Sequence, residues 1–186
     1  MKLLSVAIPC YNSESYMEHC INTLLTGGEE VEIIIVDDGS AKDRTAEIAD
    51  EYAGRYPTIC RAIHQENGGH GEAVNTGLRN ATGIFFKVVD SDDWVNEEAF
   101  QEVLETLRRF VYGEETLDML VTNFVYEKQG AKRKKVMKYN LSLIHISFLD
   151  ENRKNRKKRR KERNLRIKTD RGLTKQPDLS IMGIIS

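Results

Sequence analysis

The sequence predicts an α/β fold in which a mainly parallel sheet is flanked by helices. Apolar runs rich in β-branched residues, which are typical of buried strands, recur through the first 126 residues. Segments of helical length alternate with these runs, and this order favours crossover connections and a parallel sheet. Polar and glycine-rich turns follow several of the runs, where such sheets bind their ligands.

The expected strands are short and apolar, and turn residues bound them. In chain order they are Leu3–Pro9, Val31–Asp37, Ile59–His64, Ile84–Asp90 and Leu117–Tyr126. The expected helices are Ser13–Leu25, Asp43–Tyr56, Glu72–Asn80 and Asn96–Tyr112. Ser13 is the predicted N-cap of the first helix, Pro57 follows the second and Gly113 ends the fourth.

The pattern changes beyond Tyr126. Lys128–Lys138 is basic and turns at Gly130, which predicts a hairpin, and Leu141–Leu149 predicts one more short strand. Arg153–Arg163 then carries nine lysines or arginines in eleven positions. Such a segment buries too little apolar surface to offset the entropy of ordering the chain, so we expect a poorly ordered basic tail.

Charge divides the chain at about the same place. Residues 1–140 hold 15 Lys and Arg against 24 Asp and Glu, whereas residues 141–186 hold 13 against 5. We predict one domain over residues 1–140 and a separate tail over 141–186, either disordered or not native to the gene. Leu141–Ser147 resembles translated adapter sequence, which favours the second interpretation.

Composition excludes several classes of protein. The cysteines Cys10, Cys20 and Cys60 are too few and too widely spaced for a disulfide framework, and no Cys-x-x-Cys zinc motif occurs. No stretch approaches the roughly 18 apolar residues of a membrane span, and the apolar start is too short for a signal peptide. We expect a soluble, cytoplasmic protein, at most associated with the inner face of a membrane.

Three carboxylates within four residues, Asp90, Asp92 and Asp93, lie at the end of the fourth expected strand. At about 4 Å each like-charge pair costs about 1 kcal/mol in water and about 4 kcal/mol at an effective dielectric of 20, so the cluster favours a bound cation. In an extended chain Asp90 and Asp92 point to one side and Ser91 to the other. Because Mg²⁺ and Mn²⁺ typically take one or two protein carboxylates together with phosphate oxygens, we predict that Asp90 and Asp92 bind such an ion.

Other interpretations of this cluster fit less well. The acids could instead cap the helix that begins near Asn96, a role that suits Asp93. A calcium-binding EF-hand is excluded, because Val95 and Gln101 stand where its loop needs glycine and glutamate.

Two further turns follow the first and second strands. Tyr11 offers a flat face on which a base can stack, and Pro9 fixes the backbone as it leaves the sheet. Asp37 and Asp38 end the second strand, where a carboxylate can accept from the imide N–H of a base or from a ribose hydroxyl. Equally, these two acids could only shape the turn.

A glycine-rich stretch, Glu66–Asn75, precedes and enters the third helix. Its three glycines allow a ligand to approach the backbone closely, and a helix N-terminus favours phosphate. The stretch has neither the Gly-Lys-Ser/Thr end of a Walker loop nor a Gly-x-Gly-x-x-Gly pattern. We predict that Asn67 contacts the ligand, whereas His70 either contacts a phosphate or lines the surface.

Together these turns resemble the motifs of family 2 glycosyltransferases. Members of that family have the GT-A fold, a Rossmann-like fold that binds nucleotides. The matching segments follow the family's order and spacing over residues 1 to about 126. They are Val6–Asn12, Ile35–Ser40, Asn67–Gly69, Asn75–Leu78 and Asp90–Asp93. The resemblance implies a nucleoside diphosphate sugar donor, most often UDP-linked, with Mg²⁺ or Mn²⁺ on the diphosphate. It also implies transfer with inversion to an acceptor hydroxyl.

Carried over to this chain, the resemblance assigns the site residues. The nucleotide-sugar site comprises Pro9, Tyr11, Asn12, Asp38, Asn67, Asn75 and Asp90, and the metal site comprises Asp90 and Asp92. Asp38 and Asn67 would contact the base, and Asp90 the ribose or the metal. The implied acceptor is a glycan, a lipid or a cell-wall polymer, as in cell-surface polysaccharide biosynthesis, with no specific nucleic acid partner.

The sequence departs from the family pattern in two places. Val74 stands where many members have arginine, so one contact to the diphosphate is lost or is supplied by His70. The family's general base, an Asp in the second half, has no counterpart in a matching context, so no catalytic residue is assigned. We therefore expect the donor-binding part of a truncated enzyme, which binds the donor but transfers sugar poorly or not at all.

Two rival functions differ in testable features. A nucleotidyltransferase on a related fold would want a glycine-rich loop with a basic residue where this chain has Pro9–Asn12. Alternatively, Arg153–Arg163 binds polyanions or a membrane surface without a specific donor site.

Overall fold

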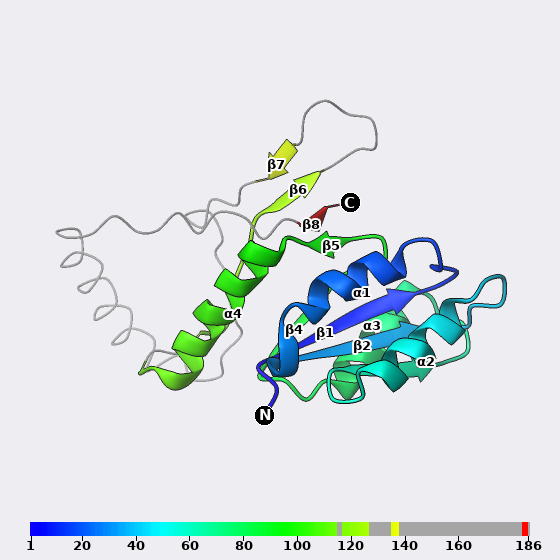
Figure 1. Ribbon diagram of the computed structural model, residues 1–186, viewed down its shortest axis with the longest axis horizontal. Helices are drawn as coiled ribbons and strands as arrows, with labels where there is room; N and C mark the ends of the chain where they lie inside the picture. Colours follow the sequence, from blue (N-terminus) through cyan, green and yellow to red (C-terminus); the bar gives the residue numbers. More distant parts are fainter. Residues whose placement is uncertain (115–116, 127–134, 138–183, 186) are drawn as a thin grey trace, which may run out of the picture. The chain divides into compact units, whose positions relative to one another are not determined.

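The computed structural model describes residues 1–114, 117–126, 135–137 and 184–185. Its elements, in chain order, are β1 (Leu4–Cys10), α1 (Met17–Leu25), the 3₁₀ turn η1 (Gly28–Glu30), β2 (Val31–Asp37), α2 (Thr45–Arg55), β3 (Cys60–His64), α3 (His70–Asn80), β4 (Phe85–Val88), β5 (Trp94–Val95), α4 (Glu97–Tyr112), β6 (Phe124–Tyr126), β7 (Lys135–Met137) and β8 (Ile184–Ile185) (Figure 1). The expected strand at Leu141–Leu149 and the basic run at Arg153–Arg163 lie outside the described residues.

Four parallel strands form the main sheet, in the order β3-β2-β1-β4. Cys10 lies beside Asp37, and Asp37 beside His64, so β1, β2 and β3 end level with one another. A smaller sheet has the order β5-β8-β6-β7, with antiparallel pairs at β5–β8 and β6–β7. The parallel main sheet confirms the predicted α/β fold class.

Two central strands form the base of the core. β1 and β2 are buried along their whole length, and one face of the sheet packs against α1, α2 and α4 while the other packs against α3. In Figure 1, α1 and α2 lie on the near side of these strands. Met17, Ile21 and Leu24 share one stripe of α1 and are completely buried. Full burial of each such side chain contributes about 1.5–3 kcal/mol relative to exposure.

The start of α1 differs from the sequence prediction. The helix begins at Met17, and the predicted N-cap role of Ser13 is wrong. The Ser13 hydroxyl instead accepts the backbone N–H of Tyr11 and pairs with the hydroxyl of Ser91 across the sheet end. A long-range partner therefore replaces the local cap.

The last expected strand and the hairpin also shift along the chain. Only β6 forms where a strand was expected over Leu117–Tyr126. The hairpin predicted over Lys128–Lys138 corresponds to the β6–β7 pair, and the connection between these strands lies outside the described residues. Among the described residues, no helix has both the length and the apolar character needed to cross a bilayer.

α3 approaches β1 closely at Gly77. A Cβ on Gly77 would collide with the Cβ of Ala7, whereas a Cβ on Gly71 in the same helix would meet no atom within 4 Å. We expect Gly77→Ala to lower the free energy of unfolding by about 1–3 kcal/mol, because overpacking separates helix and strand. Gly71→Ala, the matched control, should not lower it, since alanine favours a helix by about 1 kcal/mol over glycine. Urea denaturation followed by circular dichroism measures both, and a Gly77→Ala chain as stable as Gly71→Ala contradicts the packing argument.

Candidate functional site

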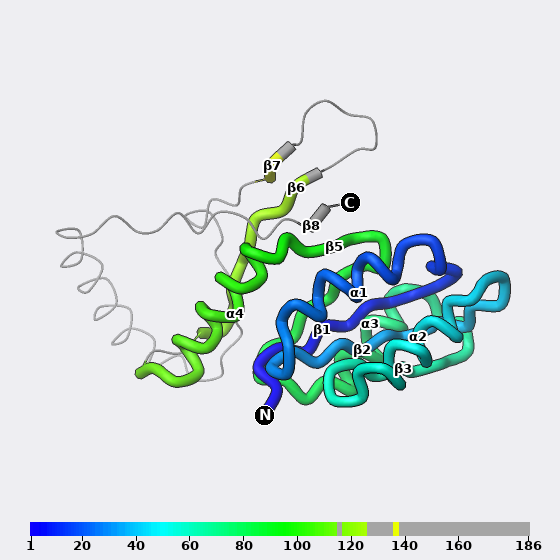
Figure 2. Tube along the Cα trace, in the orientation of Figure 1, coloured from blue at the N-terminus to red at the C-terminus, as the bar shows by residue number. Residues whose placement is uncertain are grey.

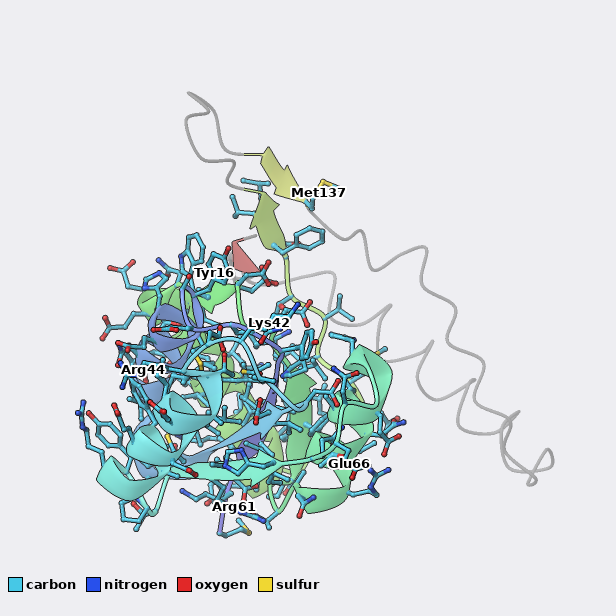
Figure 3. All side chains as sticks on the ribbon, turned by 90° about the vertical axis from the view of Figure 1, so that its right-hand side faces the viewer. Tyr16, Lys42, Arg44, Arg61, Glu66 and Met137 are labelled. Atoms are coloured by element: carbon cyan, nitrogen blue, oxygen red, sulfur yellow. The ribbon has the colours of Figure 1, made fainter. Side chains whose placement is uncertain are left out.

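One cavity of about 440 Å³ opens at the carboxyl ends of the strands. The loops after β1, β2 and β4 leave the sheet at this end (Figure 2). Figure 3 views the same end, with Tyr16, Lys42 and Glu66 on the loops that follow β1, β2 and β3. The cavity is lined by Pro9, Cys10, Tyr11, Ser13, Asp38, Asn67, Gly69, His70, Ala73, Asp90, Ser91 and Asp92. Its size lies within the range of small-molecule sites.

Most of the predicted site residues meet in this cavity. The ones that line it are Pro9, Tyr11, Asp38, Asn67, Asp90 and Asp92. Pro9 belongs to β1 and the others come from four separate turns, so the sheet topology brings together residues up to 83 positions apart in the sequence. Tyr11 is 51% exposed and therefore keeps a face free for a planar ligand.

Asn12 and Asn75, predicted as nucleotide-binding residues, are not among the lining residues. Asn12 has a left-handed backbone with φ of 51°. Its own N–H donates to Ser40 Oγ at 2.9 Å, and its side-chain oxygen accepts the N–H of Lys42 at 3.2 Å. Asn12 therefore ties the loop after β1 to the loop after β2. Asn75 is an exposed residue of α3 whose side chain hydrogen-bonds Glu72.

Asp38 is buried and holds the glycine-rich loop in place. Its Oδ1 accepts from Gln65 Nε2 at 2.7 Å and from the N–H of Gly68 at 2.8 Å, and its Oδ2 accepts from the N–H of Gly69 at 2.8 Å. Burial raises the pKa of this carboxyl, but the three donated hydrogen bonds outweigh it and hold the pKa below the usual value. Asp38 thus stays ionised while it fixes the start of α3.

The acidic turn after β4 has a different backbone from the one expected. The N–H of Asp93 donates to the carbonyl of Asp90 at 2.9 Å, so the segment is a tight turn and the expectation of an extended chain is wrong. Asp90 and Asp92 nevertheless both line the cavity. The capping interpretation is also wrong, because the Asn96 side chain caps α4 by accepting the N–H of Ala99.

Asp93 is half-buried and is not among the residues that line the cavity. Its Oδ1 is buried and has no hydrogen-bond partner. Burial first, and then the charges of Asp92 and Asp90, raise the pKa of the Asp93 carboxyl to about 6. The charges of the neighbouring carboxylates thus add to the effect of burial, and a cation at Asp90 and Asp92 would offset those charges.

The donor set suits a hard divalent cation that shares its ligands with a substrate. In the described part of the chain, no three His, Cys, Asp or Glu side chains gather closely enough to hold a metal ion. Two carboxylates on the cavity wall match the demands of Mg²⁺ or Mn²⁺, which fill their remaining positions with water and phosphate oxygens. The residues present therefore fit an ion that binds together with a diphosphate.

The sequence analysis did not assign six of the lining residues to the site: Cys10, Ser13, Gly69, His70, Ala73 and Ser91. Ser13 lines the cavity, although its helical spacing predicted only a cap. His70, for which two roles were open, lines the cavity and places Nε2 2.8 Å from Asp90 Oδ1. Ser13 pairs with Ser91, which lies 78 residues away in the sequence, and Asp90 lies 20 residues from His70. No local sequence pattern predicts contacts at such separations.

His64, at the end of β3, makes two contacts with carboxylates outside the cavity lining. Its Nδ1 lies 3.1 Å from Asp37 Oδ2, and its Nε2 lies 3.0 Å from Asp50 Oδ1. Hydrogen bonds to Asp50 and to Asp37 raise the pKa of His64, because both carboxylates favour the imidazolium. The protonated ring therefore joins β2, β3 and α2.

This arrangement predicts a dependence of stability on pH. A raised folded-state pKa gives stabilisation that is complete below the unfolded histidine value of about 6.5 and disappears as the pH rises through the folded-state pKa. The free-energy difference between wild type and His64→Gln should therefore shrink from pH 6 to pH 9. Because His64 is partly exposed, the change should be below about 1 kcal/mol. Urea denaturation across this range measures it, with Asp50→Asn as the control that removes one partner, and a difference that grows with pH contradicts the assignment.

Comparison with known proteins places the chain in a defined group. The family model described as glycosyl transferase family 2 matches residues 5–176. EpsJ of Bacillus subtilis, an uncharacterized glycosyltransferase, is 45% identical over 104 residues, which cover 55% of this chain and 30% of EpsJ. TarS of Staphylococcus aureus, a poly(ribitol-phosphate) beta-N-acetylglucosaminyltransferase, is 34% identical over 105 residues, which cover 55% of this chain and 18% of TarS.

Solved structures show the same likeness. The crystal structures of TarS 1-349 with UDP and with UDP-GlcNAc each match with a TM-score of 0.52 and 30% identity over 68% of this chain. The match covers 34% of the TarS chain in the structure with UDP and 33% of it in the structure with UDP-GlcNAc. The chain thus spans about a third of these TarS structures and less than a third of the full EpsJ and TarS sequences.

Proposed function

Because the chain belongs to glycosyl transferase family 2, we propose that its cavity binds the nucleoside diphosphate of a sugar donor together with Mg²⁺ or Mn²⁺. The observation that carries the proposal is the convergence of Tyr11, Asp38 and Asn67 with Asp90 and Asp92 on one cavity. The aromatic face of Tyr11 suits stacking on a base, and the buried carboxylate of Asp38 suits the polar edge of that base. The two exposed carboxylates suit a cation that is bound to a diphosphate.

UDP is the nucleotide that we propose, and a sugar is the group transferred. The TarS structures with UDP and UDP-GlcNAc support this choice, because they resemble the described fold at 30% identity. The acceptor that we propose is a hydroxyl of a cell-surface glycan, lipid or polymer, which the name of TarS supports. Transfer with inversion at the anomeric carbon, expected from the family resemblance, belongs to the same proposal.

In this proposal the chain's own residues bind and orient the donor. Tyr11 stacks on the base, and Asp38 and Asn67 provide polar groups in the lining of the same cavity. Asp90 and Asp92 present carboxylate oxygens to the cation. When bound, the cation supplies electrostatic stabilisation of the negative charge on the diphosphate. Transfer also needs a base for the acceptor hydroxyl, and we assign none among these residues.

Titration of the chain with UDP, in the presence of Mn²⁺ or of EDTA, tests the proposal. We expect Mn²⁺ to strengthen UDP binding and Asp92→Asn to abolish that gain, because the amide removes the anionic ligand. Glu98→Gln is the matched control: it removes one charge from an exposed residue at the start of α4, outside the cavity. Metal-independent UDP binding that Asp92→Asn leaves unchanged would refute the proposed metal site.

A further inference from the structure

The side chain of His70 makes a direct contact with the acidic turn. Its Nε2 lies 2.8 Å from Asp90 Oδ1. An ionised carboxylate only accepts hydrogen bonds, so Nε2 carries the proton in this contact. The hydrogen bond uses one oxygen of Asp90 and leaves the other oxygen for a ligand in the cavity.

The glycine-rich loop that precedes His70 fixes the position of this residue. It is the first residue of α3, and Gly69 before it has a φ of 83°, a conformation that favours glycine. The N–H groups of Gly68 and Gly69 are both bound by Asp38. A continuous set of hydrogen bonds therefore runs from the end of β2, through the glycine-rich loop, to the carboxylate at the end of β4.

The contact between His70 and Asp90 joins two side chains that are both exposed. The side chain of His70 is 64% exposed and that of Asp90 is 51% exposed, so neither contributes to the buried core. Solvent-exposed pairs contribute at most about 1 kcal/mol to stability. What the contact does provide is orientation, because it limits rotation of a carboxylate that would otherwise turn freely toward water.

We propose that His70 is a positioning residue, which holds the Asp90 carboxylate in the orientation that receives the divalent cation. The inference rests on the proposed function. Hydrogen-bond partners of metal ligands typically contribute 10–100-fold to metal affinity, because they fix the ligand before the ion arrives. His70 plays this part for Asp90 without touching the ion.

Two substitutions at His70 separate orientation from other roles. His70→Leu removes the donor but keeps similar bulk, whereas His70→Gln keeps an N–H at a comparable reach. At saturating UDP, we expect Mn²⁺ affinity to fall about 10–100-fold in His70→Leu and to recover most of that loss in His70→Gln. The melting temperature of the free chain should match wild type in both variants, and any loss of UDP affinity in EDTA should be smaller than the loss of Mn²⁺ affinity.

A double-mutant cycle tests whether His70 acts through Asp90. In an Asp90→Ala background, His70→Leu should cause no further loss of Mn²⁺ affinity. The inference is overturned if His70→Leu alone binds Mn²⁺ like wild type, if His70→Gln is as weak as His70→Leu, or if UDP affinity in EDTA falls equally. A wild-type chain that gains nothing from Mn²⁺ contradicts the proposed function itself, and the inference with it.

Discussion

Replacing Glu32 with alanine should lower the free energy of unfolding by about 1–3 kcal/mol, the usual cost of leaving a buried hydrogen-bonding group without its partner. Glu32 is 4% exposed at the start of β2. Its Oε2 accepts from Ser5 Oγ at 2.6 Å and from the N–H of Thr82 at 2.9 Å, and its Oε1 accepts from Arg61 at 3.1 Å. Alanine would leave the buried hydroxyl of Ser5 without its acceptor, whereas Thr82 and Arg61 are exposed and water can replace the acceptor that they lose.

Controls separate the network from its ion pair. The side chain of Arg61, labelled in Figure 3, projects from β3. It is 43% exposed, so Arg61→Ala should cost less than about 1 kcal/mol. Burial raises the pKa of Glu32, but the bonds from Ser5, Thr82 and Arg61 outweigh it and lower the pKa overall. The stabilisation is therefore complete above the unfolded glutamate value of about 4.3 and is lost as the pH falls through the folded-state pKa. Urea denaturation at pH 7 measures the cost, and an Arg61→Ala chain as unstable as Glu32→Ala would show that the pair dominates.

The main sheet was predictable from the sequence because its signals are local. Buried parallel strands need continuous apolar runs, and Leu4–Cys10 and Val31–Asp37 satisfy that need almost residue by residue. The polar turns then gather at one end of the sheet by topology alone, without knowledge of any side-chain contact. For the same reason the predicted set of Tyr11, Asp38 and Asp90 could be placed together.

The contacts that organise the site were not predictable in the same way. Asn12 and Ser13 resemble ordinary turn and cap residues, yet their partners, Lys42 and Ser91, belong to other loops. The tight turn at Asp90 is set by a backbone hydrogen bond, which residue types alone do not fix. Sequence patterns predict which face or end of an element a residue occupies, whereas hydrogen-bond partners depend on how the loops pack.

Replacing Asp38 with alanine should weaken UDP binding by about 10–100-fold, since about 1.4–2.8 kcal/mol of loop order is lost. The carboxylate accepts from Gln65 and from the N–H groups of Gly68 and Gly69. Without it, the glycine-rich loop must be ordered when the ligand binds, and that cost is subtracted from the binding energy. The stability cost should be smaller than that of Glu32→Ala, because Gly68 is exposed and water can replace the lost acceptor.

Amide hydrogen exchange distinguishes loop order from a direct contact to the base. In the free wild-type chain, the N–H groups of Gly68 and Gly69 should be protected by Asp38, and in Asp38→Ala they should exchange freely. Asp38→Asn keeps one acceptor oxygen but presents an amide N–H to a backbone donor, so it should protect one glycine and bind UDP with intermediate affinity. If UDP binding is lost while both amides stay protected, Asp38 acts on the nucleotide directly, and the loop owes its order to other contacts.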